Sequence, residues 1–467
     1  MESNFIPKNL NFGAARLAGY STNSFKITPT GSSTVTPGQQ ITFNLPENAT
    51  ANLNSLRLVA RVTTQDVTNT VGGVTTTVHT KLPQDSSSLI SRLDVSVNGT
   101  ALTTSASEYN TTCRVLKNAG HMSRDRDLSV DRAISHGSIS TGDASDVVDV
   151  VIQDFRGPLG GSTDTSCAFW PLNALGSVQI TMTMAGPEIL VPKQAGVGFA
   201  DADNLSASAK VAAANMTYTV SDCYLGLDTI SFGDSLYESL LRERLSQGNL
   251  EIFYKNYYTF TNDGIKSGAS STRFSVASTS IDKIYSTNRN SSYRSVGIRG
   301  HTLPDQALGD AVVGNYFRFM SFDTENTSKC GDLRVSHMVN SVMHPQYKKK
   351  AIESLADLVL YSEKSGVGAA GIIPTSLAAY HNGLYVNTVN LSHPISGMIG
   401  QVGYDSRGIS SQLSYDVTGA RVPGETVSGA TLYPATEGQL DSISHFVVVS
   451  TTAKMIIGLG RECVVQF

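Results

Sequence analysis

The side chains best suited to metal or thiol chemistry in this chain are nine histidines and five cysteines, and both sets are dispersed. The nearest two histidines, His337 and His344, have a spacing that fits neither HExxH nor another metal-binding motif. No two cysteines lie close together; they are Cys113, Cys167, Cys223, Cys330 and Cys463. We therefore predict no metal ligands and no disulfide framework, and we expect free thiols, many of them buried.

Motifs for nucleotide binding and for nucleophilic catalysis do not occur in the sequence. There is no GxxxxGK(S/T) loop, and the glycine-rich pieces at 160–161, 366–371 and 458–460 lack its spacing and its strand-then-helix setting. No GxSxG motif singles out one serine as a nucleophile. The sequence thus predicts no catalytic residue, no cofactor-binding residue and no cofactor, and it indicates a protein that is not an enzyme.

Charged side chains are sparse, at 16% of residues, and the net charge is −4. The densest charged cluster, from Arg124 to Arg132, alternates in sign, which favours a solvated or inter-subunit salt-bridge network. The densest basic run is Lys348-Lys349-Lys350, which we place in a solvated turn at the start of a helix. Neither cluster nor the overall charge indicates sequence-specific nucleic-acid binding.

Aromatic side chains gather in one segment, at Phe253, Tyr254, Tyr257, Tyr258 and Phe260. Such a cluster could stack on bases or sugars, but Lys255 is the one charge within it. Half-buried strands use the same residue types. We therefore favour a strand over a binding surface for this segment.

The elements that must position these side chains are mostly strands. Val178, Ile180, Met182 and Met184 alternate with polar residues, which predicts a strand with one face in a core. Further strands are expected at 40–45, 55–63, 93–97, 147–155, 216–230, 250–260, 272–278, 315–322, 383–391 and 412–417, with a pair within 446–466. Many short strands separated by polar turns are typical of sandwiches or jelly rolls.

Two helices are predicted with a local reason for each. Ser235 and Glu238 form a capping box ahead of leucines, and Gly248 follows the end of this helix, which lies near the middle of the chain. A second helix is expected over residues 348–361, with Ile352, Leu355 and Val359 on its buried face. The first of these helices is our candidate for a connector between two domains.

Long polar loops are expected at 64–82, 119–145, 185–208, 288–314 and 421–439. Structureless loops of this length are uncommon in compact domains and usually belong to functional or contact surfaces. We expect these loops to meet neighbouring molecules.

One order of elements occurs twice, about 240 positions apart. Residues 88–99 alternate as a strand and are followed by Tyr109 and a helix over 112–118, while residues 332–337 are followed by Tyr347 and the helix over 348–361. A chain of 467 residues also exceeds the size at which single cores stop growing. The sequence therefore predicts two similar tandem domains.

The whole-chain order resembles the double jelly-roll major capsid proteins of tailless icosahedral DNA viruses, the lineage of adenovirus, tectivirus and virophage capsids. Three segments carry the likeness: residues 87–99 with Tyr109, residues 218–228 before the connector helix, and residues 280–285 early in the second half. The resemblance implies an all-β fold of two tandem eight-stranded jelly rolls with a few short helices in connecting loops. It places an N-terminal arm at 1–20, the first roll at 21–231, the connector helix at 232–248 and the second roll at 249–467.

The function that the resemblance implies is assembly. Three chains would form a pseudo-hexameric homotrimer, and trimers would tile an icosahedral virion shell through trimer–trimer contacts, with penton and minor capsid proteins as further partners and a possible contact with an internal membrane. The first 20 residues lack a basic-flanked apolar core, so we expect no signal peptide and synthesis in the host cell interior, followed by localisation to the virion capsid.

Three other classes fit less well. A single-roll capsid protein of a small RNA virus often carries a basic arm, whereas the first 20 residues hold Lys8 and Arg16 as their basic side chains. A carbohydrate-binding or adhesive β-sandwich is the alternative from another class, and the missing signal sequence and unpaired thiols count against it. An enzyme of the cupin type needs clustered histidine and carboxylate ligands, which the sequence lacks.

Overall fold

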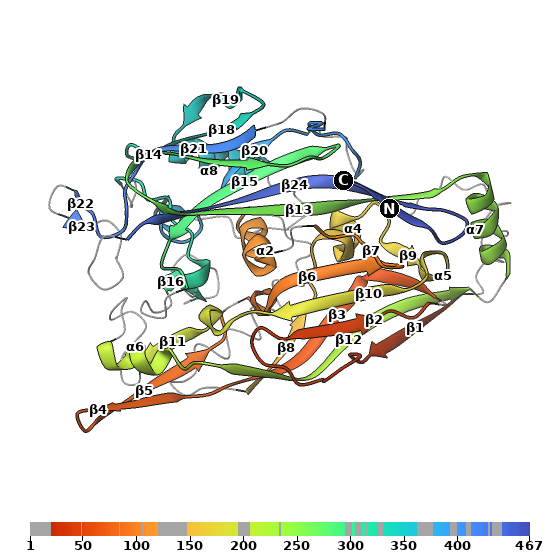
Figure 1. Ribbon diagram of the computed structural model, residues 1–467, viewed down its shortest axis with the longest axis horizontal. Helices are drawn as coiled ribbons and strands as arrows, with labels where there is room; N and C mark the ends of the chain where they lie inside the picture. Colours follow the sequence, from red (N-terminus) through yellow and green to blue (C-terminus); the bar gives the residue numbers. More distant parts are fainter. Residues whose placement is uncertain are drawn as a thin grey trace, which may run out of the picture.

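The chain folds into two β-sandwich halves that lie side by side (Figure 1). The computed structural model describes residues 20–467 except 48, 84, 105–106, 120–146, 195–205, 233–234, 295–300, 304–310, 314, 326–329, 362–376, 393–398, 408–411, 428–429 and 432–440. Strands up to Phe232 pair with one another, and strands from Leu250 onward do the same.

Two antiparallel sheets face each other in the first half. One has the order β1-β12-β3-β8, with β9 also paired to β3; its strands are β1 (Tyr20–Ile27), β12 (Tyr218–Phe232), β3 (Thr50–Thr64), β8 (Val147–Ile152) and β9 (Phe169–Pro171). The other has the order β2-β10-β6-β7, with β2 (Gln40–Asn44), β10 (Val178–Met184), β6 (Ile90–Val97) and β7 (Thr100–Ala101). Eight strands crossing between two sheets in this order form a jelly roll.

The second half repeats the order strand for strand. One sheet is β13-β24-β15-β20, with β25 paired to β24; the strands are β13 (Leu250–Ile265), β24 (Ile443–Ile457), β15 (Ile281–Asn290), β20 (Asn387–Asn390) and β25 (Cys463–Gln466). The other is β14-β21-β18-β19, with β14 (Gly268–Ser275), β21 (Gln412–Ala420), β18 (Arg334–Val339) and β19 (Val342–Lys349). Hence β13 holds the place of β1, and β18 holds that of β6.

The alternating patterns form strands because one side of each sheet is desolvated. In β10 the apolar residues Val178, Ile180, Met182 and Met184 are all buried, as predicted. In β6 the side chains of Leu93, Val95 and Val97 are buried in the same way. Asn98 and Gly99 then adopt positive φ of 49° and 81°, a turn for which Asn-Gly is favoured.

The predicted repeat of strand, turn and helix is present in both halves. Helix α2 (Tyr109–Asn118) follows the β6–β7 hairpin, and helix α8 (Ala351–Tyr361) follows the β18–β19 hairpin. Helix α7 (Ser235–Gln247) lies in the sequence between the two sets of strands. The predicted buried face of α8 is wrong in part: Leu355 packs against the core as predicted, but Ile352 is 47% exposed, and the buried residues are Ala351, Ser354 and Leu358.

Two other sequence expectations are also wrong. Residues 64–82 form a hairpin of β4 (Val67–Val71) and β5 (Val74–Lys81) rather than a loop, because Gly72 and Gly73 supply the positive φ of a tight turn. Residues 315–322 do not form a strand; they begin with η4 (Asn315–Phe317), and Phe319 makes one isolated bridge to Leu384. This segment is buried without pairing along a sheet: Tyr316 and Phe317 pack in the first-half core, and Phe319, Met320 and Phe322 pack in the second-half core.

Small elements complete the described chain. Strand β11 (Val191–Gln194) extends the β4–β5 hairpin, and helix α6 (Ala207–Ala213) packs on it. The rest are η1 (Ser86–Leu89), η2 (Gly157–Leu159), α4 (Gly161–Asp164), α5 (Leu172–Leu175), η3 (Pro187–Ile189), β16 (His301–Leu303), β17 (Ala311–Val313), α9 (Leu377–Asn382), β22 (Thr426–Val427) and β23 (Ala430–Thr431). In the described part of the chain, no helix is long and apolar enough to span a membrane.

Candidate functional site

The structure brings His337 and His344 into register on the hairpin of β18 and β19. His337 is fully buried, and its pKa falls to about 3 because burial penalises the charged imidazolium and Lys349 adds repulsion. Among the residues that the structure describes, no group of three or more His, Cys, Asp or Glu side chains is placed to hold a metal ion. The pair thus belongs to the packing of the second half.

The basic run at 348–350 corrects an expectation. Lys348 and Lys349 end strand β19 and do not begin a helix. Lys349 is 1% exposed, so it is not in a solvated turn; it donates to Asp357 at 2.9 Å and to the carbonyl oxygen of Thr388 at 3.1 Å. Both contacts satisfy the ammonium group of Lys349, which is removed from water. Because one acceptor belongs to α8 and the other to β20, Lys349 holds these two elements together.

The remaining candidates from the sequence are the charged cluster, the glycine-rich pieces and the cysteines. The charged cluster at 124–132 and the glycines at 366–371 lie outside the described residues. Gly160 lies between η2 and α4, Gly161 is the first residue of α4, and residues 458–460 lie in the turn between β24 and β25. All five cysteines are free thiols; Cys113 and Cys223 are buried, and the other three are partly buried.

The aromatic cluster lies on strand β13, as favoured, and β13 forms the boundary between the two halves. The Tyr254 side chain is 0% exposed and donates to the carbonyl oxygen of Leu102 at 2.7 Å. The backbone of Phe253 is bonded to Ser166 in both directions, at 2.8 and 3.0 Å. We call this contact region, where β13, β24 and β15 meet α2 and residues 98–104, 107–109 and 154–166, the seam.

Polar bonds cross the seam along its whole length. At one end, Asn98 donates to the carbonyl oxygen of Arg461 at 2.8 Å. In the middle, Asn256 donates to Thr104 at 2.8 Å and Tyr257 donates to Asp164 at 3.1 Å. Asn256 is buried and Tyr257 is half-buried, so the middle of the contact excludes most water, whereas the Asn98 side chain at the end of the seam is exposed.

The apolar core is also continuous through the seam. The first-half cluster includes Ile252 and Tyr254 of β13 and Ala453, Met455 and Ile457 of β24. The second-half cluster, in turn, includes Val115 and Leu116 of α2 and Ala119, which directly follows the helix. Because each core contains residues of the other half, the halves cannot slide past each other without exposing apolar surface.

Helix α2 is the centre of the seam, and all ten of its residues are buried (Figure 1). Lys117, which is 2% exposed, donates to Asp85 at 2.7 Å and lies 3.6 Å from Asp154. Arg156, which is 1% exposed, lies 3.2 Å from the other oxygen of Asp154. The charges therefore neutralise one another inside the protein, as buried ions must.

Electrostatics keep this network charged. Burial by itself would raise the pKa of Asp85, but the positive charges of Lys117 and Arg114 outweigh it and lower that pKa to about 2. For Arg156, burial works against the charged form, yet Asp154 and Asp164 raise its pKa. Burial also raises the pKa of Cys113 well above the ordinary value of a thiol, so this side chain is not a poised nucleophile.

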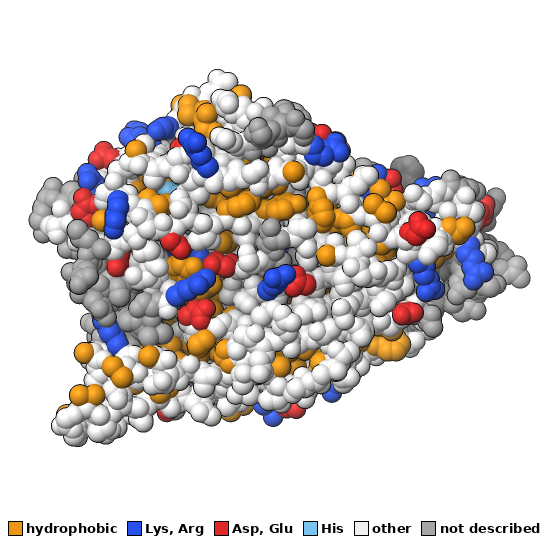
Figure 2. Space-filling model, viewed as in Figure 1, with side chains coloured by type: hydrophobic (Ala, Val, Ile, Leu, Met, Phe, Trp, Pro, Cys, Tyr) orange, Lys and Arg blue, Asp and Glu red, His pale blue; other side chains and the backbone are white. Residues whose placement is uncertain are grey.

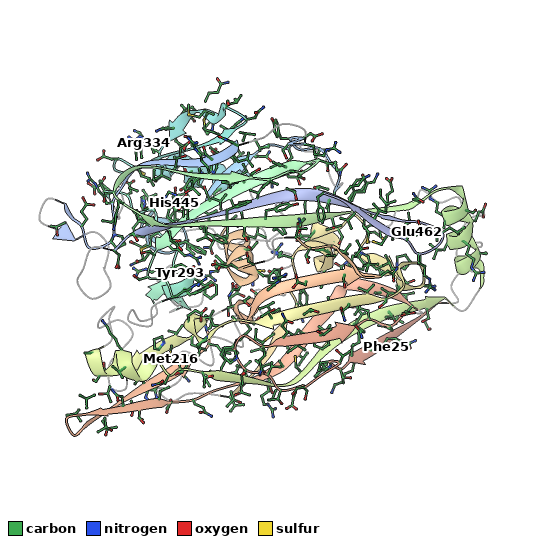
Figure 3. All side chains as sticks on the ribbon, viewed as in Figure 1. Phe25, Met216, Tyr293, Arg334, His445 and Glu462 are labelled. Atoms are coloured by element: carbon green, nitrogen blue, oxygen red, sulfur yellow. The ribbon has the colours of Figure 1, made fainter. Side chains whose placement is uncertain are left out.

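A second ionic contact crosses the seam beside α2. Glu108, immediately before the helix, accepts from Arg289 of β15 at 2.6 Å and from Tyr293 at 3.2 Å. The Arg289 guanidinium is fully buried and lies 3.4 Å from the centroid of the ring of Tyr293 (labelled in Figure 3), a cation–π contact. Arg294 adds an exposed contact to Glu108 at 3.3 Å.

The seam has a mechanical effect and not a chemical one. It converts two jelly rolls into one rigid block, because apolar burial, crossing hydrogen bonds and paired charges all join the same surfaces. Sequence reasoning missed Asp85, Lys117, Asp154 and Arg156, because scattered single charges resemble solvated surface residues. The signal that pointed toward them was the repeated strand–turn–Tyr–helix order, which places α2 directly after β6 and β7.

The fold of this chain is similar to that of known proteins, although its sequence is not. No family model matches the sequence, and no curated protein matches it. A chain of the PBCV-1 virus capsid is 13% identical with a TM-score of 0.60, and the match covers 96% of this chain and 97% of that chain. The Faustovirus major capsid protein is 10% identical with a TM-score of 0.53, with coverage of 98% and 92%.

The structure of the Sputnik virophage contains a further similar chain, 12% identical with a TM-score of 0.52, covering 96% of this chain and 88% of that one. At such low identity these likenesses show a shared fold. Together with the repeated strand order, they confirm the predicted all-β architecture of two tandem jelly rolls.

Proposed function

We propose that this chain is a major capsid protein, the structural subunit of an icosahedral virion shell. Three copies form a pseudo-hexameric homotrimer, and trimers tile the shell through contacts between neighbouring trimers. The role is structural and not catalytic. The protein is made inside the host cell and resides in the virion, where penton and minor capsid proteins complete the shell and an internal membrane is a possible further contact.

The observation that carries the proposal is the apolar contact along the seam between two jelly rolls that have the same strand order. A trimer of such chains presents six similar rolls, and a subunit of a lattice must keep the angle between its two rolls constant. Continuous apolar burial through α2 and β13 supplies that constancy, because hinge motion would open a desolvated contact. Capsid chains with the same fold over nearly the full length support this reading.

The domain bounds belong to the proposal. The first roll spans 21–231, the connector helix 232–248 and the second roll 249–467, in keeping with the pairing of β1 through β12 and of β13 through β25. Residues 1–20 are proposed as an arm that contacts neighbouring subunits or the inner side of the shell.

The test is the size and shape of the purified protein. We expect column separation with light scattering to give three times the chain mass of 49.7 kDa, and negative-stain images of that peak to show a hexagonal outline. A stable monomer that never forms plates or shells would contradict the proposal. It would favour the carbohydrate-binding β-sandwich alternative, which a glycan screen would then examine.

A further inference from the structure

Helix α7 lies at one end of the molecule, and two of its leucines join neither apolar core of the described residues (Figure 1). Leu241 and Leu245 are half-buried and four residues apart, so they share one face of the helix. A helix of 13 residues is marginal in water without tertiary packing. This face of α7 therefore needs an apolar partner.

A cleft opens beside these leucines. It has a volume of about 430 Å³ and is lined by α7, by α5 and by the turn between β24 and β25. Its apolar lining is Ala174, Leu241, Leu245 and Leu459, and Leu459 is 64% exposed. Figure 2 shows hydrophobic side chains among charged ones at this end of the molecule, at the right of the view. A cleft of this size is within the range of clefts that bind ligands.

The polar lining of the cleft suits a peptide backbone. Arg242 and Arg461 add guanidinium donors, to which backbone carbonyl oxygens can accept. Asn173 adds a buried side-chain oxygen that has no hydrogen-bond partner among the described residues. A buried acceptor without a donor is costly, and a backbone N–H would supply the donor. The lining thus fits an extended segment of polypeptide that has one apolar face.

Residues 9–14, which lie outside the described part of the chain, have the sequence of such a segment. Leu10, Phe12 and Ala14 alternate there with two asparagines and a glycine. Alternation of this kind gives an extended segment one apolar face and one polar face. The three apolar side chains match the apolar lining of the cleft.

The described chain begins near enough to the cleft for this segment to reach it. Tyr20, the first residue of β1, pairs with Phe232, three residues before α7. Strands β1, β12, β3 and β9 are successive neighbours, and α5 directly follows β9. Three strand spacings are about 14 Å. The eight residues from Phe12 to Tyr20 can span about 26 Å, which is more than enough.

We propose that residues 9–14 dock in this cleft of their own chain, with Leu10 and Phe12 against the three leucines of the cleft. The contact covers the apolar face of α7 and supplies the donor that Asn173 lacks. It lies within one chain, so it goes beyond the proposed assembly and does not depend on it. The first eight residues remain available for contacts with other molecules.

The first test measures chymotrypsin cleavage of the Phe12–Gly13 bond in the full chain. Leu459→Glu places a charge in the cleft at a largely exposed position, so the fold should survive. We expect cleavage about tenfold faster or more, because proteolysis follows the population of the open segment. The control Val74→Glu changes a side chain that is 67% exposed at the β4–β5 tip, at the opposite end of Figure 1, and should leave the rate unchanged. Equal rates in the two variants overturn the proposal.

Leu10→Glu tests the segment instead of the cleft. It is expected to speed cleavage at Phe12 to a similar extent, after correction for the cleavage rate of the matching free peptide. The double variant L10E/L459E should be no faster than either single variant, because both changes remove the same contact. Rate increases that multiply in the double variant would show two independent effects and would overturn the pairing of segment and cleft.

Disulfide cross-linking distinguishes the chain's own segment from that of a second copy. Asn11→Cys or Gly13→Cys is combined with Arg242→Cys, which changes the rim of the cleft and keeps every apolar side chain. Mild oxidation is expected to give an intrachain disulfide, identified by peptide mapping without reduction, because the bond requires Cα atoms about 4.4–6.8 Å apart. The control N11C/V74C should give none. Interchain disulfides, or no disulfide with either pair, overturn the proposal.

These results separate the docked segment from the proposed assembly. A monomer that forms the intrachain disulfide supports this contact and contradicts the capsid proposal. A trimer in which Leu459→Glu leaves the cleavage rate unchanged overturns this contact and leaves the capsid proposal standing.

Discussion

The two rolls share one strand order but bury different kinds of polar side chain. Between the sheets of the first roll the core is aliphatic and aromatic, with Phe43, Val95, Ile180 and Leu225 all buried, and charges gather outside it at the seam. Between the sheets of the second roll, His337 and His445 flank Tyr415, with ring centroids 5.1 and 4.9 Å apart.

This difference shows that the jelly-roll topology constrains volume and alternation more tightly than it constrains residue type. Paired ions require partners of opposite charge, and the largest buried network of the first half, formed by Asp85, Lys117, Asp154 and Arg156, lies where that half meets the second. A neutral imidazole needs no partner of opposite charge when it is buried, so it fits between the two sheets of one roll, as His445 does (labelled in Figure 3). The two solutions respond differently to mutation and to acid.

The largest effect is expected from Lys117→Met at the seam. The substitution leaves Asp85 and Asp154 buried without their ammonium partner, which typically costs about 3–5 kcal/mol. Urea unfolding monitored by circular dichroism measures the loss. The matched control is Arg92→Met, which removes an exposed partner of Asp94 and is expected to cost about 0–1 kcal/mol. Equal losses would contradict the role given to the buried network.

Mild acid should act first on the second roll. His337 and His445 have folded pKa values of about 3, against an ordinary 6.5, because burial disfavours their charged forms. The unfolded chain therefore binds protons that the folded chain does not, so their contribution is complete above pH 6.5 and falls as pH drops toward 3. At pH 5 the expected loss is about 2 kcal/mol per histidine.

Unfolding free energies at pH 7 and pH 5 test this expectation. His337→Phe keeps a ring beside Tyr415 and should reduce the loss between the two pH values. His344→Phe, on the neighbouring strand β19 and partly exposed, serves as the control. A wild-type protein with the same unfolding free energy at pH 7 and pH 5 would contradict the proposal that buried neutral histidines distinguish the second roll from the first.

Strong acid should act on the seam. Asp85 has a pKa of about 2 in the folded chain and 3.8 in its ordinary state, so its stabilisation is present above pH 3.8 and is lost as pH falls through 2. The expected loss at pH 2 is about 2 kcal/mol. In Asp85→Asn this acid step should vanish, whereas the histidine step between pH 6.5 and 5 should persist. A variant that loses both steps would show that the two regions titrate together.

The smallest loss of stability is expected from removing a single hydrogen bond across the seam. Tyr254→Phe removes the bond to the carbonyl oxygen of Leu102 while it keeps the ring in the apolar seam, for an expected loss of about 1 kcal/mol. Tyr347→Phe is the control, because that side chain is 55% exposed on β19. A Tyr254→Phe protein as stable as wild type would mean that this hydrogen bond adds nothing measurable to the packing of the seam.

Local patterns were sufficient to predict many of the elements. The alternation in 178–184, the Asn98-Gly99 turn and the Gly-terminated helix after Ser235 each follow from a preference that acts over a few residues. Predictions failed where packing decided. The buried face of α8 differs from the expected one because Lys349 ties the helix to β20 through Asp357, and residues 315–322 are buried without joining a sheet.

The seam lay beyond sequence reasoning for a physical reason. Asp85, Lys117 and Asp154 are up to about 70 positions apart, and their mutual attraction exists only after three segments meet in a desolvated space. The same holds for Glu108 and Arg289, which lie 181 positions apart. A charge on its own in a sequence is far more often solvated than buried.

By itself, the sequence determined the all-β class, the tandem repeat, the helix after Ser235 and the absence of recognisable catalytic motifs, because alternation, turn residues and motif spacing are local properties. Tertiary structure alone decided which roll covers which strand. It buried β13 and α2 within the chain and left β1 and the α8 surface open, because apolar and ionic complementarity across a contact depends on surfaces that exist only after each roll has folded.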